Sequence, residues 1–309
     1  MIYEIGHRTT YTYEKPVSFA RCVLRLTPTT AGLQSLLESK VTVTPEPSST
    51  LHGRGAFGEA TQTIIIDRPH EKLIIEAKSR VDVRTSVQLG LHDSVPWEAV
   101  RASANASRSL AADSPASFLY PTRRTPIIAA ITDYARVSFT PGRPVSDAAA
   151  ELMTRIRNDF VYDPSATTVS TPALEAFEAR HGVCQDFAHI MICGVRGLGL
   201  PAAYVSGYLR TSPPPGRPRL EGADATHAWV SIWCGNDQGW IGFDPTNAVL
   251  AQTSHIVLAN GRDYSDVAPI DGIILAPGAQ TLKVEVNVVP EDEIIAAAAA
   301  ARVPAMAKF

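Results

Sequence analysis

The sequence predicts an α+β protein, because two kinds of hydrophobic periodicity occupy different parts of the chain. Residues 2–95 alternate apolar and polar side chains with period 2, are rich in β-branched and aromatic residues, and are interrupted by glycine, proline and serine. This pattern is typical of an antiparallel β-sandwich. From residue 146 onward, helical periods are mixed with short strand-like runs. A length of 309 residues suits about two domains.

The predicted sandwich covers residues 1–95. Its strands are expected at residues 3–11, 41–43, 61–66, 73–77 and 81–83. Residues 51–59 (LHGRGAFGE) are glycine-rich and are predicted to form a turn. No helical pattern follows these glycines, so they do not predict a phosphate-binding loop.

Residues 96–145 are predicted to be a linker with partial helix. The composition changes near Ser94, and residues 101–117 are rich in alanine, serine and asparagine. Pro121 and Pro126 then interrupt any regular pattern.

Residues 146–290 are predicted to form the second domain. Helices are expected at residues 146–160 and 172–180, and a third helix begins at Cys184, where apolar residues recur every three to four positions up to Leu198. Strands are expected at residues 203–209, 227–233 and 240–243, followed by a closing pair at 273–275 and 282–289. Residues 291–309 are predicted to be an alanine-rich helical tail with an acidic start.

The composition excludes some classes of partner. A net charge of −3 and a pI near 6.2 provide no basic field for nucleic acid or an anionic membrane. The N-terminal residues lack the pattern of a secretion signal, and the longest apolar run, residues 294–301, is far short of the roughly 20 residues of a membrane span. We therefore expect a cytoplasmic protein whose four cysteines form no disulfides.

Cys184 is the candidate nucleophile. It follows Gly182 and Val183 at the first turn of a predicted helix, where the helix dipole and free N–H groups stabilise a thiolate and an oxyanion. His227 begins a predicted strand and is the candidate base, while Asp244 ends the next strand. A hairpin over the 17 residues between them would bring these two side chains together, so that Asp244 orients the imidazole.

Several segments together resemble the bacterial transglutaminase-like family, whose members are often described as cysteine proteases. The segments of the second domain are GVCQDFA at 182–188, AYVSGY at 203–208, THAWV at 226–230 and GWIGFDPT at 239–246. HRTTYTY at 7–13 and LRLTP at 24–28 resemble the β-rich N-terminal domain of the family, and GRDYSDV at 261–267 resembles its closing segment. The resemblance covers nearly the whole chain in the expected order.

The resemblance implies a papain-like transglutaminase core, in which a nucleophile helix packs on an antiparallel sheet. It implies Cys184 as nucleophile, His227 as base and Asp244 as orienting residue, with no metal and no cofactor. The superfamily usually has a second oxyanion donor upstream of the cysteine, and the nearest candidate is Tyr162. Gln185 could donate instead, as could the backbone alone.

The predicted function is a cysteine-dependent amide-bond hydrolase that acts on a peptide, isopeptide or other amide through a thioester. Two alternatives stay open: an acyltransferase or transglutaminase with an amine acceptor, and a non-catalytic interaction module. Hydrolysis is favoured because nothing in the sequence marks a site for an acceptor amine. Asp186 either caps the helix or steers an amine substrate, and Trp229 belongs to the core or to the cleft wall. The oligomeric state is left open.

Overall fold

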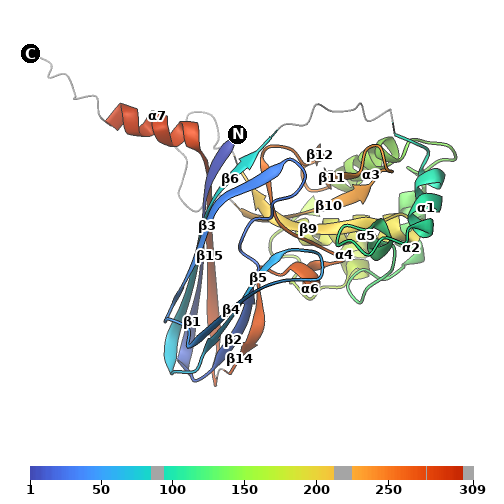
Figure 1. Ribbon diagram of the computed structural model, residues 1–309. Helices are drawn as coiled ribbons and strands as arrows, with labels where there is room; N and C mark the ends of the chain where they lie inside the picture. The colour runs from blue at the N-terminus through green and yellow to red at the C-terminus, as the bar shows by residue number, and fades with distance from the viewer. Residues whose placement is uncertain (85–93, 212–224, 276, 302–309) are drawn as a thin grey trace, which may run out of the picture.

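The computed structural model describes residues 1–84, 94–211, 225–275 and 277–301, and it confirms the α+β class. Two four-stranded antiparallel sheets form the sandwich, with strand orders β15-β1-β6-β3 and β14-β2-β5-β4 (Figure 1). The strands of the first sheet are β15 (Gln280–Pro290), β1 (Ile2–Val17), β6 (His70–Val83) and β3 (Gln34–Thr44). Those of the second are β14 (Ile270–Ile274), β2 (Ala20–Leu24), β5 (Ala60–Ile66) and β4 (Ser49–Arg54).

The period-2 pattern explains the sandwich core. Along β6, buried and less buried residues alternate, so that Leu73, Ile75 and Ala77 face inward. They meet Ile64 and Ile66 from β5 in one apolar cluster. The glycine-rich turn is shorter than expected, because β4 extends to Arg54 and only the residues after it form the turn.

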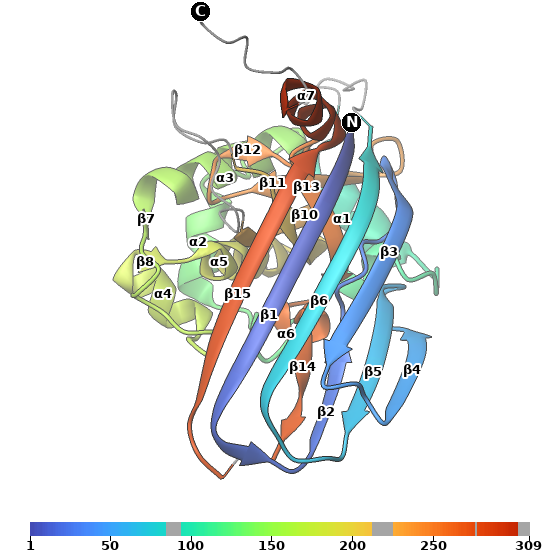
Figure 2. The ribbon, with the colours of Figure 1, turned by 90° about the vertical axis from the view of Figure 1, so that its left-hand side faces the viewer.

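The closing strands lie in the sandwich, not at the end of the second domain. We predicted that the core continues to residue 290, but β14 pairs with β2 and β15 pairs with β1 along eleven residue pairs. Figure 2 shows β15 and β1 side by side over their length. The physical reason is that Val286 and Val288 join an apolar cluster with Tyr3 and Ile5.

The core is a five-stranded antiparallel sheet of order β12-β11-β10-β9-β13, with helix α5 (Cys184–Gly197) on one face. Its strands are β12 (Val249–Leu250), β11 (Trp240–Asp244), β10 (Ala225–Trp233), β9 (Ala202–Leu209) and β13 (His255–Gly261). Helices α3 (Val145–Asp159), α4 (Ala173–Ala179) and α6 (Tyr264–Val267) also belong to the core. Residues 255–261 were not predicted as a strand.

The segment predicted as a linker is part of the core. It contains α1 (Trp97–Ala106), the 3-10 helix η2 (Pro115–Phe118) and α2 (Ala129–Arg136). Val100, Ile131 and Phe139 are buried in the same apolar cluster as α5. Because the residues between these positions have low hydrophobicity, the composition of the segment did not reveal the helical spacing of its apolar residues. The tail helix α7 (Glu291–Ala301) follows β15 directly.

The sandwich and the core share a buried interface. Tyr208 and Ile256 from the core sheet pack against residues of β1, β6 and β15. The Gln34 side chain donates to the Val257 carbonyl at 2.8 Å and accepts from the Val257 N–H at 2.8 Å, as a neighbouring strand would. Apolar packing and hydrogen bonds therefore both hold the core sheet against the sandwich.

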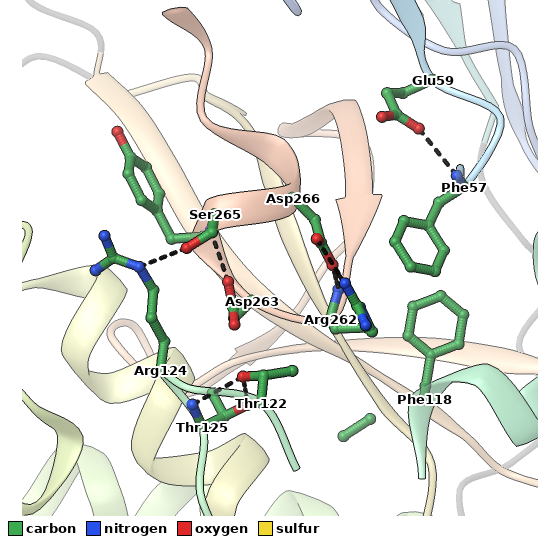
Figure 3. A network of polar contacts seen from close by, with 12 residues as sticks. Phe57, Glu59, Phe118, Thr122, Arg124, Thr125, Arg262, Asp263, Ser265 and Asp266 are labelled. Atoms are coloured by element: carbon green, nitrogen blue, oxygen red, sulfur yellow. Dashed lines mark hydrogen bonds and ion pairs between the residues drawn. The ribbon is translucent and has the colours of Figure 1, made fainter. Parts of the chain in front are cut away.

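A buried arginine holds the C-terminal end of α5. Arg196 donates to the carbonyls of Phe118, Ala202 and Arg262 and to the Thr125 hydroxyl. The segments that contain Thr125 and Arg262 also contact each other directly. Arg124 Nε donates to the Ser265 hydroxyl at 2.6 Å (Figure 3).

Among the described residues, no helix is long and apolar enough to cross a bilayer.

Candidate active site

Helix α5 begins at Cys184, as the sequence predicts. Val183 precedes it in an extended conformation, and its N–H donates to Asp186 Oδ2 at 2.8 Å. The same oxygen accepts from the Thr167 hydroxyl at 2.6 Å. Gly182 is required here, because a Cβ atom would lie 2.7 Å from that oxygen. Asp186 thus makes the capping contact and also anchors the segment that contains Thr167.

Two adjacent strands bring His227 and Asp244 together. β10 and β11 are antiparallel with Val230 opposite Phe243, so the start of β10 lies beside the end of β11. His227 Nε2 lies 2.9 Å from Asp244 Oδ2, and Cys184 lies close enough to the same ring to raise its pKa. With Nε2 engaged by the carboxylate, Nδ1 is the nitrogen left for the sulfur. Cys184 is half-buried, while the other two side chains are buried.

The Asp244 carboxylate is surrounded by hydrogen-bond donors. Oδ2 accepts from His227, from Asn247 Nδ2 at 2.7 Å and from His255 Nε2 at 3.1 Å. Oδ1 accepts from the backbone N–H groups of Thr246 and Asn247 at 2.9 and 3.2 Å. Burial alone would raise the pKa of Asp244, but these bonds hold it well below its usual range, so the group is an anion at neutral pH.

The same anion decides the protonation of His227. Burial lowers the pKa of a histidine, but the hydrogen bonds to Asp244 and Cys184 outweigh it and raise the pKa of His227 to about 10. The imidazole is therefore held ready to carry a proton next to the Cys184 sulfur.

His255 is the residue of this cluster that sequence reasoning missed. It is buried at the start of β13. Within the described residues, His227, Asp244 and His255 form a group whose ligand atoms lie within 4.8 Å of one another. The Asn247 amide that donates to the same oxygen fits a hydrogen-bonded anion better than a metal ligand, because a cation would repel that N–H. The available signal was a histidine shortly before the GRDYSDV segment.

Trp229 lies behind the histidines. Its indole stacks on His227 with centroids 6.1 Å apart and meets His255 edge-on at 5.1 Å. Gly207 is needed beside it, because a Cβ there would lie 2.5 Å from the indole. A cavity of 810 Å³ lies between the core sheet and the sandwich. Trp229, His255, Trp240, Phe57 and Gln34 are among its lining residues.

The two candidate oxyanion donors are in different positions. Tyr162 is half-exposed on β7 (Val161–Tyr162), opposite Gly182 of β8 (His181–Gly182). Burial and the nearby charge of Cys184 raise the pKa of Tyr162. Gln185 is buried, and its amide nitrogen donates to the Val169 carbonyl at 3.1 Å, so it holds the neighbouring loop.

Both halves of the chain are similar to known proteins. Residues 3–82 match the bacterial transglutaminase-like N-terminal region, and residues 133–245 match the transglutaminase-like superfamily. An uncharacterized protein of Mycobacterium tuberculosis is 40% identical over 296 residues, which cover 93% of this chain and 92% of that protein. The chain belongs to the bacterial transglutaminase-like family. The second match begins at residue 133, inside the segment that we predicted to be a linker.

Other proteins are similar to the chain over most or part of its length. An uncharacterized protein of Mycobacterium leprae is 31% identical over 290 residues, covering 92% of this chain and 97% of that protein. A protein-glutamine gamma-glutamyltransferase of Pseudomonas aeruginosa is 32% identical over 131 residues, which are 38% of this chain and 20% of that enzyme. A proposed cysteine protease from Cytophaga hutchinsonii has the same fold, with a TM-score of 0.70, 21% identity and coverage of 94% and 92%.

Proposed function

We propose that the protein is a cysteine-dependent amide-bond hydrolase acting on a peptide or isopeptide. The observation that carries the proposal is the placement of Cys184 beside His227, whose ring is hydrogen-bonded to a buried, ionised Asp244. A nucleophile, a base and an orienting anion in this order are the arrangement that acyl transfer requires. A binding module would not need to bury an ionised carboxylate beside a thiol and an imidazole.

In the proposed first step, the Cys184 sulfur, whose proton His227 already holds, adds as a thiolate to the amide carbonyl carbon. The resulting oxyanion accepts from the Cys184 backbone N–H at the start of α5, and the Tyr162 hydroxyl is the proposed second donor. The His227 imidazolium then gives its proton to the leaving nitrogen. The amine departs and a thioester remains on Cys184.

In the second step, His227 takes a proton from water as the water oxygen adds to the thioester carbonyl. Collapse expels the Cys184 sulfur as a thiolate beside the protonated His227, and a carboxylic acid is released. Asp244 accepts the Nε2–H bond throughout, which keeps Nδ1 directed toward the sulfur.

Acyl transfer to an amine is the second candidate function. The similarity to the Pseudomonas aeruginosa gamma-glutamyltransferase over 131 residues favours it. The two reactions share every step up to the thioester and differ only in whether water or an amine attacks it. The acceptor therefore separates them in an experiment.

The test uses a pool of peptides of defined sequence, some with a Lys isopeptide bond, incubated in ¹⁸O-labelled water. Acid quenching and mass mapping should show an acyl adduct on the Cys184 peptide and one ¹⁸O in the product carboxylate. Adding cadaverine measures the alternative, since net amide formation would support the acyltransferase. Identical products from Cys184→Ala would contradict both.

Selective alkylation gives a test that needs no substrate. Iodoacetamide at neutral pH should label Cys184 far faster than the other three cysteines, because Cys22, Cys193 and Cys234 are buried. Equal labelling of all four in the native protein, measured by peptide mass mapping, would remove the thiol from the proposed mechanism.

A further inference from the structure

His255 contacts the site from the opposite edge of the core sheet. β13, which it begins, is one edge strand, whereas Asp244 ends β11 on the other side of β9 and β10. The chain between β12 and β13 connects these two edges. His255 Nε2 nevertheless lies 3.1 Å from Asp244 Oδ2, and the ring is only 4% exposed.

The hydrogen bond fixes the tautomer of His255. An ionised carboxylate can only accept, so Nε2 must carry the proton. Nδ1 lies 3.3 Å from the Ser254 hydroxyl, which can donate to it. Both ring nitrogens of His255 then have hydrogen-bond partners.

The same oxygen serves both histidines. Asp244 Oδ2 accepts from His227 on one side and from His255 on the other, with Asn247 as third donor. A carboxylate that is fully buried must receive hydrogen bonds from protein groups, since no water solvates it. Losing one of them leaves the anion less stabilised and freer to rotate about its χ2 bond.

We propose that His255 is a positioning residue that holds Asp244 Oδ2 where it accepts the hydrogen bond from His227 Nε2–H; this role rests on the proposed function. His255 does not touch the substrate or the sulfur. Its ring also contacts the edge of Trp229, whose face stacks on His227, so the indole is fixed between the two histidines. His255 and Trp229 together separate the site from the 810 Å³ cavity, which both residues line.

The test is a double-mutant cycle between His255 and Asp244. His255→Gln keeps an N–H donor, whereas His255→Met has a similar length and shape without one. Both are made in the wild type and in Asp244→Ala, and kcat and KM are measured on the peptide that forms the Cys184 adduct. His255→Met should lower kcat about 10- to 100-fold with KM unchanged, the factor expected for one hydrogen bond to a charged group, and His255→Gln should recover most of it.

In the Asp244→Ala background, Met and Gln at position 255 should give kcat values within about twofold of each other, because the group through which His255 acts is gone. Equal losses in both backgrounds, or unchanged kcat in His255→Met, would overturn the proposal. His7→Phe is the matched control, since His7 is equally buried but is bonded to the hydroxyls of Tyr208 and Thr9. It should cost stability and leave kcat unchanged.

Alkylation separates failure of this inference from failure of the proposed function. The rate of Cys184 labelling by iodoacetamide is measured in the same set of variants. If no peptide forms an adduct but labelling still falls in His255→Met only when Asp244 is present, the hydrolase assignment fails and the positioning role stands. If peptides are hydrolysed and neither kcat nor labelling responds to His255→Met, the positioning role fails alone. If Met unfolds the protein, as its melting temperature would show, His255→Phe replaces it.

Discussion

Three of the buried histidines of this protein, His7, His189 and His227, have opposite protonation properties because their environments differ. Burial lowers the pKa of His7, beside two hydroxyls, to about 4. Burial also lowers the pKa of His189 to about 4, although Asp263 lies nearby, because Arg124 and Arg196 oppose that effect. His227 is as buried, but the bonds to Asp244 and Cys184 raise its pKa to about 10. Burial alone keeps His7 and His189 neutral, whereas the interactions with Asp244 and Cys184 favour the protonated form of His227.

The cysteines divide in the same way. Burial raises the pKa of Cys22 to about 11 and those of Cys193 and Cys234 to about 12. Cys184 is half-buried and lies beside the His227 ring. This less buried thiol is therefore found where the start of α5 meets the start of β10 and the end of β11.

The largest effect on turnover should come from Cys184, and the second cysteine of α5, Cys193, is its control. Cys184→Ala should lower turnover by at least about 10⁴-fold, as expected for loss of a nucleophile, with little change in melting temperature. Cys193→Ala, on the same helix, should lower the melting temperature by removing buried volume and leave kcat unchanged. Comparable turnover in the two variants would break the distinction between the site and the rest of the core.

A somewhat smaller effect is expected for the anion. Asp244→Asn should lower kcat by about 10³- to 10⁴-fold, because an amide stabilises the His227 imidazolium poorly and favours the wrong tautomer. Asp263→Asn is the control: Asp263 is also buried, but it caps α6 through the Ser265 N–H. Steady-state kinetics on both variants checks this, and an equal loss in Asp263→Asn would contradict the special role of Asp244.

The smallest effect concerns stability at low pH. His7 and His189 have folded-state pKa values near 4, below the unfolded value of 6.5, so the unfolded chain binds protons first as the pH falls. Each should cost at most about 1.4 kcal/mol of unfolding free energy per pH unit between pH 6.5 and 4. His7→Phe should flatten this slope by one proton in urea titrations. For His227 the sign is opposite: its contribution is present below pH 6.5 and lost as the pH rises toward 10.

Local patterns in the sequence were sufficient for most of the fold. Alternation along residues 2–83 marks the sandwich, and the helical repeat after Cys184 marks α5, because each pattern is a property of one element. The helices near Trp97 and Ile131 were predicted only as part of a linker with partial helix, because large apolar side chains are few on each and do not mark a buried face. The return of β14 and β15 to the sandwich could not be read from the chain, since pairing with β2 and β1 is a long-range choice among similar strands.

The same limit applies to the site. Cys184, His227 and Asp244 were candidates because each sits at the end of an element that the pattern predicts, and hairpin geometry joins two of them. His255 was missed because it reaches Asp244 from a strand that is not adjacent to β11, so no spacing rule connects the two. Gln185 was a candidate by position alone, and its contact with Val169 depends on how the intervening loop folds back.

The account depends most directly on the charge of one buried imidazole. Long-range ¹H–¹⁵N correlation spectra of the histidine rings at pH 7 report whether one or both nitrogens are protonated. His227 should show the pattern of an imidazolium, while His7 and His189 should show neutral tautomers. A neutral His227 in the wild type, indistinguishable from the other two, would contradict the claim that the buried anion at Asp244 creates the base.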